Sequence, residues 1–177
     1  MVVAGNLTLL RPVDAGDIMS IQRWDNDPDI IKLVGKKFLT PGHSLRWFSS
    51  IRKSKVRLAL AITDSNTGRL IGDVELENIS WRSRSGELRV CIGERDYWGK
   101  GFGTDAIRSF TDFVFGTMNL DYIYLRVYRS NARAIKCYKK CGFQVEGVLK
   151  AGTRAYNGHE DLLLMSRKRR PAAPPSA

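Results

Sequence analysis

A chain of 177 residues with 43% hydrophobic and 27% charged residues is long enough to bury the core of one globular domain and is unlike an intrinsically disordered protein. Lysine and arginine outnumber aspartate and glutamate by 29 to 18, and the net charge of +11 favours nucleic acid or a phosphorylated small ligand over a polycationic substrate. No apolar run reaches the ~18 residues of a membrane span. The three cysteines, an odd number, favour a reducing compartment, so we expect a cytoplasmic protein without membrane association.

The first third of the chain predicts one strand followed by two helices. Residues 7–13 have the composition of a strand. A helix is expected over 14–28, because Asp14 can cap its N-terminus and Pro28 would stop it. A second helix is expected over 41–54, on which one apolar face would hold Leu45, Phe48 and Ile51.

The remainder alternates strands with helices. A hairpin is expected over 57–63 and 69–79, and the later elements are a strand over 86–93, a helix over 106–114, a strand over 122–128, a helix over 131–142 and a strand over 161–167. This order predicts a mixed α/β sheet. We assign residues 1–168 to a single domain and residues 169–177 to a basic, proline-rich, disordered tail.

One segment, "YWGKGFGTD" at 97–105, places Gly99, Gly101 and Gly103 between a strand-like run and a helix-like run. Clustered glycines permit a positive φ or a close approach to the main chain, and a helix N-terminus offers unpaired N–H groups to a phosphate. A Walker P-loop is excluded because Lys100 is not followed by Ser or Thr, and the G-x-G-x-G spacing does not match the Rossmann fingerprint. The segment indicates either pyrophosphate binding by an acyl-CoA transferase or a tight turn without a ligand.

Two motifs together resemble the GNAT superfamily of N-acyltransferases. The family's acyl-CoA motif, Q/R-x-x-G-x-G/A, aligns from Trp98 through Gly101 to Gly103, with Trp98 in place of the usual Gln or Arg. The second signature, N-x-x-A-x-x-x-Y-x-K-x-G-F, is matched by Asn131, Ala134, Tyr138, Lys140, Gly142 and Phe143. The resemblance covers roughly residues 7–168 and is strongest to the branch with ribosomal-protein-alanine, spermidine and amino-sugar N-acetyltransferases.

The resemblance implies a GNAT fold and a binding site for acetyl-CoA. Its sheet would have about seven strands and about four flanking helices, and would splay between the strands 86–93 and 122–128. The positions that match the family's cofactor contacts are Cys91, Ile92, Gly93, Trp98, Gly99, Lys100, Gly101, Phe102, Gly103, Thr104, Asn131 and Lys140. Among these, the N–H near Ile92 would stabilise the oxyanion, and Asn131 would bond the pantetheine, cap its helix, or do both.

Tyr138 matches the family's general acid, which gives its proton to the departing thiolate. The alternative is that Tyr138 is a packing residue. The general base is less defined: Glu87 and Glu75 lie on neighbouring predicted strands and could act through water, or could be ordinary solvated charges. The acceptor would contact the segment Trp24, Asp25 and Asn26, although a tryptophan there can also belong to the core. Cys137 and Cys141 lack further ligand-type residues nearby, so small buried residues are expected there and no metal.

The predicted activity is direct transfer of an acetyl group from acetyl-CoA to a primary amine in a ternary complex. A protein N-terminus, as in ribosomal proteins, or a nucleotide-linked amino sugar is the expected acceptor, because the net charge disfavours a polyamine. Polyamine or antibiotic acetylation is the alternative within the family. A CoA-binding protein without catalysis and a nucleic-acid-binding protein are the alternatives outside it, and nucleic acid is disfavoured because no nucleic-acid motif is present. The resemblance also allows a homodimer.

Overall fold

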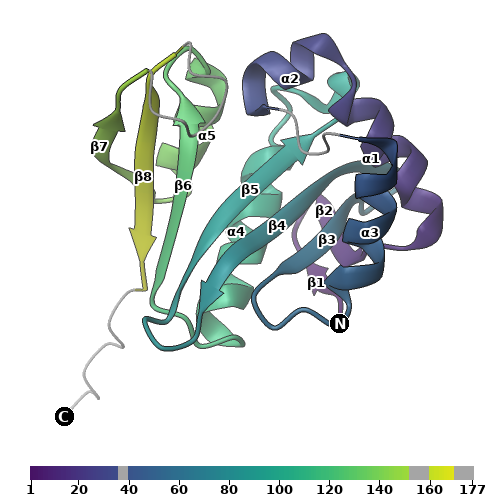
Figure 1. Cartoon of the computed structure of the whole chain (residues 1–177), viewed down its shortest axis with the longest axis horizontal. Helices are drawn as coiled ribbons and strands as arrows, with labels where there is room; N and C mark the ends of the chain where they lie inside the picture. Colours follow the sequence, from purple (N-terminus) through teal and green to yellow (C-terminus); the bar gives the residue numbers. More distant parts are fainter. Residues whose placement is uncertain (36–39, 152–159, 170–177) are drawn as a thin grey trace.

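The computed structural model describes residues 1–35, 40–151 and 160–169. Their strands form one sheet with the order β1-β2-β3-β4-β5-β6-β8-β7 (Figure 1). Every neighbouring pair is antiparallel except β5 and β6, which are parallel. The strands are β1 (Val3–Ala4), β2 (Thr8–Pro12), β3 (Leu58–Asp64), β4 (Leu70–Ser80), β5 (Ser85–Ile92), β6 (Tyr122–Tyr128), β7 (Gln144–Leu149) and β8 (Leu162–Lys168).

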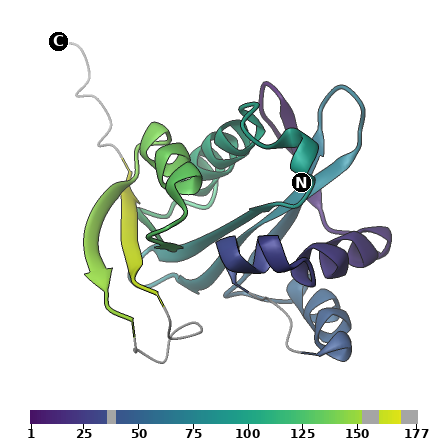
Figure 2. The ribbon, with the colours of Figure 1, turned by 90° about the horizontal axis from the view of Figure 1, so that it is seen from above.

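Helices cover both faces of this sheet, as the view from above shows (Figure 2). One face carries α4 (Phe102–Gly116) and α5 (Ala132–Lys140), and the other carries α1 (Ile18–Asp25), α2 (Pro28–Val34) and α3 (Pro41–Ile51). Each face has its own apolar core. The side chains of β5 alternate between the two cores: Leu88, Val90 and Ile92 face α4 and α5, whereas Cys91 packs with α1 and α3.

The sheet is splayed at its only parallel pair within the described residues. Strands β5 and β6 pair only at Ser85–Tyr122, Gly86–Ile123 and Glu87–Tyr124. Beyond Glu87 the two strands diverge, and a wedge opens between them (Figure 1). The splayed GNAT-type sheet predicted from the two motifs is confirmed.

The helix expected over 14–28 is wrong in its extent. A short 3-10 helix (Ala15–Asp17) comes first, and Asp14 caps it by accepting a hydrogen bond from the Gly16 N–H at 2.8 Å. Helix α1 then ends at Asp25, and Pro28 begins α2 instead of ending a helix. Proline fits the first turn of a helix because it lacks only an N–H that has no intrahelical partner there, and Asp27 caps α2 through the Asp29 N–H at 2.9 Å.

Three further details differ from the sequence-based prediction. The short strand β1 and the edge strand β7 were not predicted, and β7 was missed because its side chains are mostly exposed and its register shifts between Val145 and Gly147. The buried face of α3 holds Ser44 and Trp47, while Leu45 is 61% exposed.

In the described ranges no helix is long and apolar enough to cross a membrane. Residues 170–177 of the predicted tail lie outside the described residues.

Candidate active site

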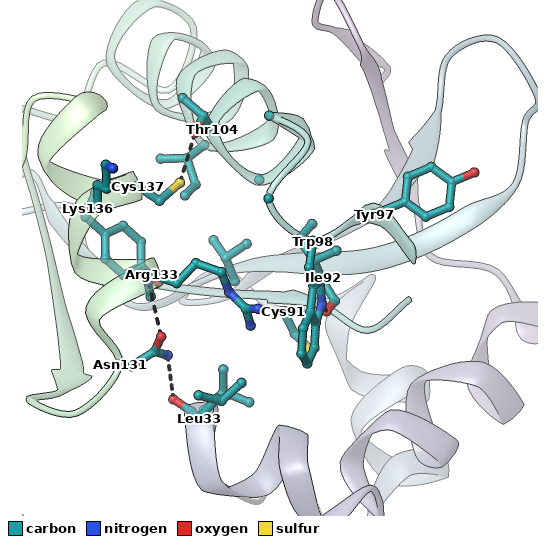
Figure 3. A pocket seen from close by; sticks show the side chains of 18 of the residues that line it. Leu33, Cys91, Ile92, Tyr97, Trp98, Thr104, Asn131, Arg133, Lys136 and Cys137 are labelled. Atoms are coloured by element: carbon teal, nitrogen blue, oxygen red, sulfur yellow. Dashed lines mark hydrogen bonds between the residues drawn. The ribbon is translucent and has the colours of Figure 1, made fainter. Parts of the chain in front are cut away.

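A cavity of about 370 Å³ occupies the wedge between β5 and α5 (Figure 3). Four parts of the chain meet there: the C-terminal half of β5, the glycine turn with the start of α4, the inner face of α5, and α2. Its lining residues are Ile30, Leu33, Val34, Val90, Cys91, Ile92, Tyr97, Trp98, Gly99, Gly101, Gly103, Thr104, Ile107, Asn131, Arg133, Ala134, Lys136, Cys137, Tyr138 and Lys140.

The glycine turn brings main-chain N–H groups to the cavity. Gly99 and Gly101 have φ angles of 75° and 93°, in the region that favours glycine, and Gly101 is the N-cap of α4 without a side-chain cap. The first N–H groups of an α-helix have no intrahelical acceptor and carry partial positive charge. Gly103 does not need a positive φ, but a Cβ there would point toward Ile92 and Cys137, at 3.6 and 3.9 Å, and would occupy part of the cavity.

Asp105, in the first turn of α4, fixes this turn against β2. Its carboxylate accepts hydrogen bonds from the N–H groups of Asn6, Leu7 and Thr8 at 3.0, 3.0 and 2.9 Å and from Thr8 Oγ1 at 2.7 Å. Burial alone would raise the pKa of Asp105, but these hydrogen bonds, led by that of the Thr8 hydroxyl, outweigh it and lower the pKa. Asp105 is therefore an ionised anchor for the N-terminal end of α4.

Trp98 and Arg133 meet across the mouth of the cavity. The Trp98 indole N–H donates a hydrogen bond to the Ile92 carbonyl at 2.6 Å, which fixes the ring beside β5. The Arg133 guanidinium reaches from α5 to lie 3.9 Å from the centroid of that ring, as Figure 3 shows. The tryptophan that departs from the family's usual Gln or Arg thus supplies a cation–π partner to α5.

Asn131 joins the two helices at the other end of the cavity. Its Oδ1 accepts the Ala134 N–H at 3.1 Å, which caps α5, and its Nδ2 donates to the Leu33 carbonyl of α2 at 3.0 Å (Figure 3). The capping role predicted for Asn131 is present. The contact with α2 was not predicted, because α2 itself was missed.

Tyr138 lines the cavity and is only 8% exposed. Burial raises the pKa of its hydroxyl, Cys137 adds to the rise, and the positive charge of Arg89 opposes it. The hydroxyl is therefore protonated at neutral pH and available as a hydrogen-bond donor. Its ring packs edge-on against Phe143 with 5.8 Å between centroids.

Cys137 is a cavity residue with unusual acidity. Its hydrogen bond with Cys141 is the largest cause that lowers the pKa of the thiol, to about 7, against the opposing effect of burial, and Thr104 and the charges of Lys140 and Arg108 lower it further. The sequence predicted only a small buried residue here. Its spacing of three residues from Ala134 was a signal that it shares the cavity face of α5.

The two carboxylates considered as bases are not among the described residues that line the cavity. Glu87 sits where β5 and β6 part, and its oxygens accept from Arg126 Nε at 2.7 Å and Asn78 Nδ2 at 3.0 Å. Glu75 is fully buried and accepts from the Trp47 indole N–H at 3.2 Å. Both are on the α1–α3 side of the sheet, so they face the opposite side from the glycine turn.

Several other predicted site residues have different surroundings. Trp24 is 3% exposed in the core, and its indole N–H donates to Glu94 at 2.9 Å. Gly93 is a glycine because a Cβ there would lie 2.0 Å from the Trp24 ring. Phe102 packs edge-on against Tyr97. The predicted site residues that are not among the described residues lining the cavity include Trp24, Asp25, Asn26, Gly93, Lys100 and Phe102.

Two parts of the cavity wall were not predicted from the sequence. The first is the α2 wall, at Ile30, Leu33 and Val34, and the second is the pair of cations Arg133 and Lys136. The cations had a detectable signal, since residues 133, 136 and 140 are spaced three and four apart and share one face of a helix. No group of three or more His, Cys, Asp and Glu residues that could hold a metal ion is found among the described residues.

Residues 8–144 match the model of the family described as "Acetyltransferase (GNAT) domain". The chain belongs to this family. As a GNAT acetyltransferase, it is an enzyme that uses acetyl-CoA to acetylate an amine, which confirms the predicted family, enzyme class and co-substrate.

Curated relatives of this GNAT enzyme include two spermidine N(1)-acetyltransferases. The protein from Vibrio cholerae is 31% identical over 144 residues, which cover 79% of this chain and 80% of the relative. The protein from Escherichia coli K12 is 30% identical over 152 residues, which cover 79% of this chain and 74% of the relative. The crystal structure of the Vibrio cholerae spermidine N-acetyltransferase in complex with CoA and spermine is similar with a TM-score of 0.82 and 27% identity, covering 92% of this chain and 95% of that one.

Proposed function

We propose that this enzyme acetylates a primary amine of a polyamine such as spermidine or spermine, by direct transfer in a ternary complex. The observation that carries the proposal is the splayed sheet, which has main-chain N–H groups and cations on its α4–α5 side and the carboxylates of β4 and β5 on its α1–α3 side. The names of the two curated relatives and of the similar crystal structure support a polyamine acceptor.

The cavity suits acetyl-CoA. The glycine turn and the first turn of α4 would hold the pyrophosphate through N–H groups, since Gly103 leaves space that a side chain would fill. The pantetheine would follow the edge of β5 at Cys91 and Ile92, which line the wedge with Tyr138 opposite them. Acetyl-CoA supplies an activated acetyl group as a thioester.

Two groups of the chain would act on the reacting atoms. The N–H near Ile92 would donate to the carbonyl oxygen as it gains negative charge, an interaction worth roughly 3 kcal/mol in comparable sites. Tyr138 would donate a hydrogen bond to the sulfur as the C–S bond breaks. Because burial raises the pKa of Tyr138, complete proton transfer to a thiolate of pKa ~8.5 is more uphill than from a free phenol, and the charge of Arg89 offsets part of that cost.

The acceptor would enter from the α1–α3 side, where β4 and β5 present carboxylates. Three carboxylates occupy every second position of β4 and therefore share one of its faces: Asp73, Glu75 and Glu77. Glu77 pairs with Glu87 on β5. This is a local cluster of carboxylates, buried at Asp73, Glu75 and Glu87, and it would suit a polycation although the whole chain carries a net charge of +11. Under this proposal the net charge is a poor guide to the acceptor, because recognition depends on the charges beside the reacting amine. The amine would lose its proton through water toward Glu87 or Glu75.

A peptide N-terminus and a nucleotide-linked amino sugar are the competing acceptors. An amino sugar linked to a nucleotide is anionic, and the carboxylates on this face disfavour it. A homodimer and a cytoplasmic location stay predictions.

The test is steady-state kinetics with acetyl-CoA and a panel of amines: spermidine, spermine, a peptide with N-terminal alanine, a UDP-linked amino sugar and an aminoglycoside. We expect kcat/KM for a polyamine to exceed that for each other amine by roughly tenfold or more. Preferred acetylation of the peptide or the amino sugar would contradict the polyamine proposal and leave the family assignment intact.

A further inference from the structure

Two connecting segments rich in cations adjoin at the end of the sheet where β4 ends and β5 begins. Residues 52–57 link α3 to β3, and residues 81–84 link β4 to β5. The Trp81 indole N–H donates a hydrogen bond to the Lys55 carbonyl at 2.7 Å, which fixes the two segments side by side (Figure 1). This end of the sheet is remote from the wide part of the wedge between β5 and β6.

The charged side chains of both segments are all positive, since neither contains an aspartate or a glutamate. Arg57 and Arg84 pair with nearby carboxylates at 3.4 and 3.0 Å. In contrast, Lys53, Lys55 and Arg82 are exposed and have no carboxylate of the described residues within 4.0 Å. Together with Trp81, these three cations define what we call the basic surface.

Trp81 differs from the other tryptophans in its exposure. Trp24 and Trp47 are buried in the core and Trp98 lines the cavity, whereas Trp81 is 52% exposed. Its hydrogen bond to Lys55 orients the ring, so little side-chain entropy is lost when a second planar group stacks on it. An oriented aromatic ring among unpaired cations is typical of surfaces that bind single-stranded nucleic acid, whose bases stack while the phosphates contact the cations.

A hollow of about 420 Å³ borders the basic surface. It is lined by hydroxyl, amide, cationic and apolar side chains: Ser50, Lys53, Ser54, Val56, Arg57 and Asn78. No carboxylate is among these described lining residues. Hydroxyl, amide and cationic groups are the side chains that commonly donate to phosphate oxygens, so the hollow extends the surface for a second phosphate.

We propose that the basic surface binds single-stranded nucleic acid without strong sequence preference, with Lys53, Lys55 and Arg82 on the phosphates and Trp81 stacked on a base. A linear motif would not reveal this surface, because Lys55 and Trp81 are 26 residues apart in the chain and meet only in the fold. The surface also gives a role to part of the net charge of +11, which the amine acceptor does not explain. Because nucleic acids attract polycations as counterions, an enzyme bound to one would meet the proposed polyamine acceptor at a raised local concentration.

The test is fluorescence anisotropy of the full chain with a labelled oligouridylate RNA of about 12 nucleotides, at about 50 to 200 mM salt. The wild type should bind with a dissociation constant in the micromolar range at the lower salt. The triple variant Lys53→Gln/Lys55→Gln/Arg82→Gln should bind roughly tenfold or more weakly. Its slope of log affinity against log salt should be shallower by about two, because each phosphate contact to a single strand contributes ~0.7.

A second triple variant, Lys32→Gln/Arg129→Gln/Lys139→Gln, is the matched control. It removes the same net charge from exposed positions on α2, after β6 and on α5, and should keep the wild-type affinity within about twofold. A melting curve and the acetyl transfer rate without RNA verify that each variant is folded. If both triple variants lose affinity equally, general charge attracts the RNA and the basic surface is not a site.

Trp81→Ala separates nucleic acid from other polyanions. It should weaken RNA binding roughly tenfold and leave the affinity for heparin unchanged, because heparin is a polyanion without bases. Equal loss for both ligands, or no loss for RNA, would overturn the stacking role and with it the assignment to nucleic acid.

Two further results would overturn the proposal. One is a wild-type protein that fails to bind the RNA at about 50 mM salt. The other is a change of oligomeric state in Trp81→Ala or in the Lys53, Lys55 and Arg82 variant, measured by light scattering, since the surface would then be a contact between copies of the chain. The polyamine proposal is independent of all these results, because acetyl transfer is measured without nucleic acid.

Discussion

Thr104 Oγ1 and Cys137 Sγ lie 3.2 Å apart and connect the first turn of α4 to the middle of α5 in the wall of the cavity (Figure 3). The Cys137 thiol shares the cavity with the glycine turn, so a cofactor bound as proposed would shield it. Cys91 and Cys141, at 9% and 3% exposure, are more deeply buried.

We expect Cys137 to react first with a thiol-specific alkylating reagent. Its hydrogen bond with Cys141 lowers the pKa of the Cys137 thiol, so the rate should reach half its maximum at a pH below the ~8.5 of an ordinary cysteine. Saturating CoA should slow the reaction, and Cys137→Ser should abolish the fast phase. Mass spectrometry identifies the labelled residue. Labelling at an unchanged rate under saturating CoA would place the cofactor elsewhere.

Gly103→Val tests whether the cavity must stay open at the glycine turn. The added side chain would point toward Ile92 and Cys137 without the strain of a positive φ, so the protein should fold while CoA affinity falls by roughly tenfold or more. Gly116→Val is the matched control, because it makes the same change at the far end of α4, where a Cβ meets nothing within 4 Å. Isothermal titration calorimetry gives both affinities. Wild-type affinity in a folded Gly103→Val protein would refute the assignment of the turn.

Asp105→Asn should destabilise the protein by about 1–3 kcal/mol at pH 7, because it weakens hydrogen bonds that depend on a partly buried charge. The pKa of Asp105 is lowered in the folded state, so its contribution is complete above the unfolded value of about 3.9 and is lost as the pH falls through the folded pKa. Denaturant unfolding at pH 7 and below pH 4 should therefore show the variant's deficit shrinking with acid. The exposed Asp96, changed to Asn, serves as control, and a deficit that stays constant with pH would argue against an ionised anchor.

The roles of Glu87 in amine binding and in the ion pair with Arg126 can be separated with one single variant and one double variant. Glu87→Gln should raise KM for spermidine roughly tenfold if the carboxylate attracts the amine. Arg126→Met added to Glu87→Gln removes the other partner of the ion pair. If Glu87 contacts the amine, KM stays high in the double variant. Recovery of wild-type kinetics there would mean that Glu87 serves only to neutralise Arg126.

The fold and the α4–α5 side of the cavity could be predicted from the sequence because they depend on local features. The positive φ angles of Gly99 and Gly101 favour glycine, which marks the turn before α4. Asn131 and Tyr138 are separated by two turns of one helix, so their spacing alone places them on the same face of α5. Local patterns of this kind were sufficient to locate both helices that line this side of the cavity.

The α1–α3 side of the sheet was predicted less well. Helix α2 begins at Pro28, a residue that can stop one helix or start the next, and the preceding Asp27 cap was a local signal for a start that was missed. The burial of Trp24 against Gly93 and the ion pair of Glu87 with Arg126 join residues distant in the chain. The net charge sums all charged residues regardless of where they lie in the fold. For this reason it pointed away from a polyamine.

The most direct test of the account is the turnover of Tyr138→Phe with acetyl-CoA and spermidine. The change removes one hydroxyl from a buried cavity residue and leaves the ring against Phe143, so folding and cofactor binding should persist. We predict that kcat falls by roughly 10²–10⁴ while KM for acetyl-CoA stays nearly unchanged. A melting curve controls for folding. Wild-type turnover in a folded Tyr138→Phe protein would contradict the account and make Tyr138 a packing residue.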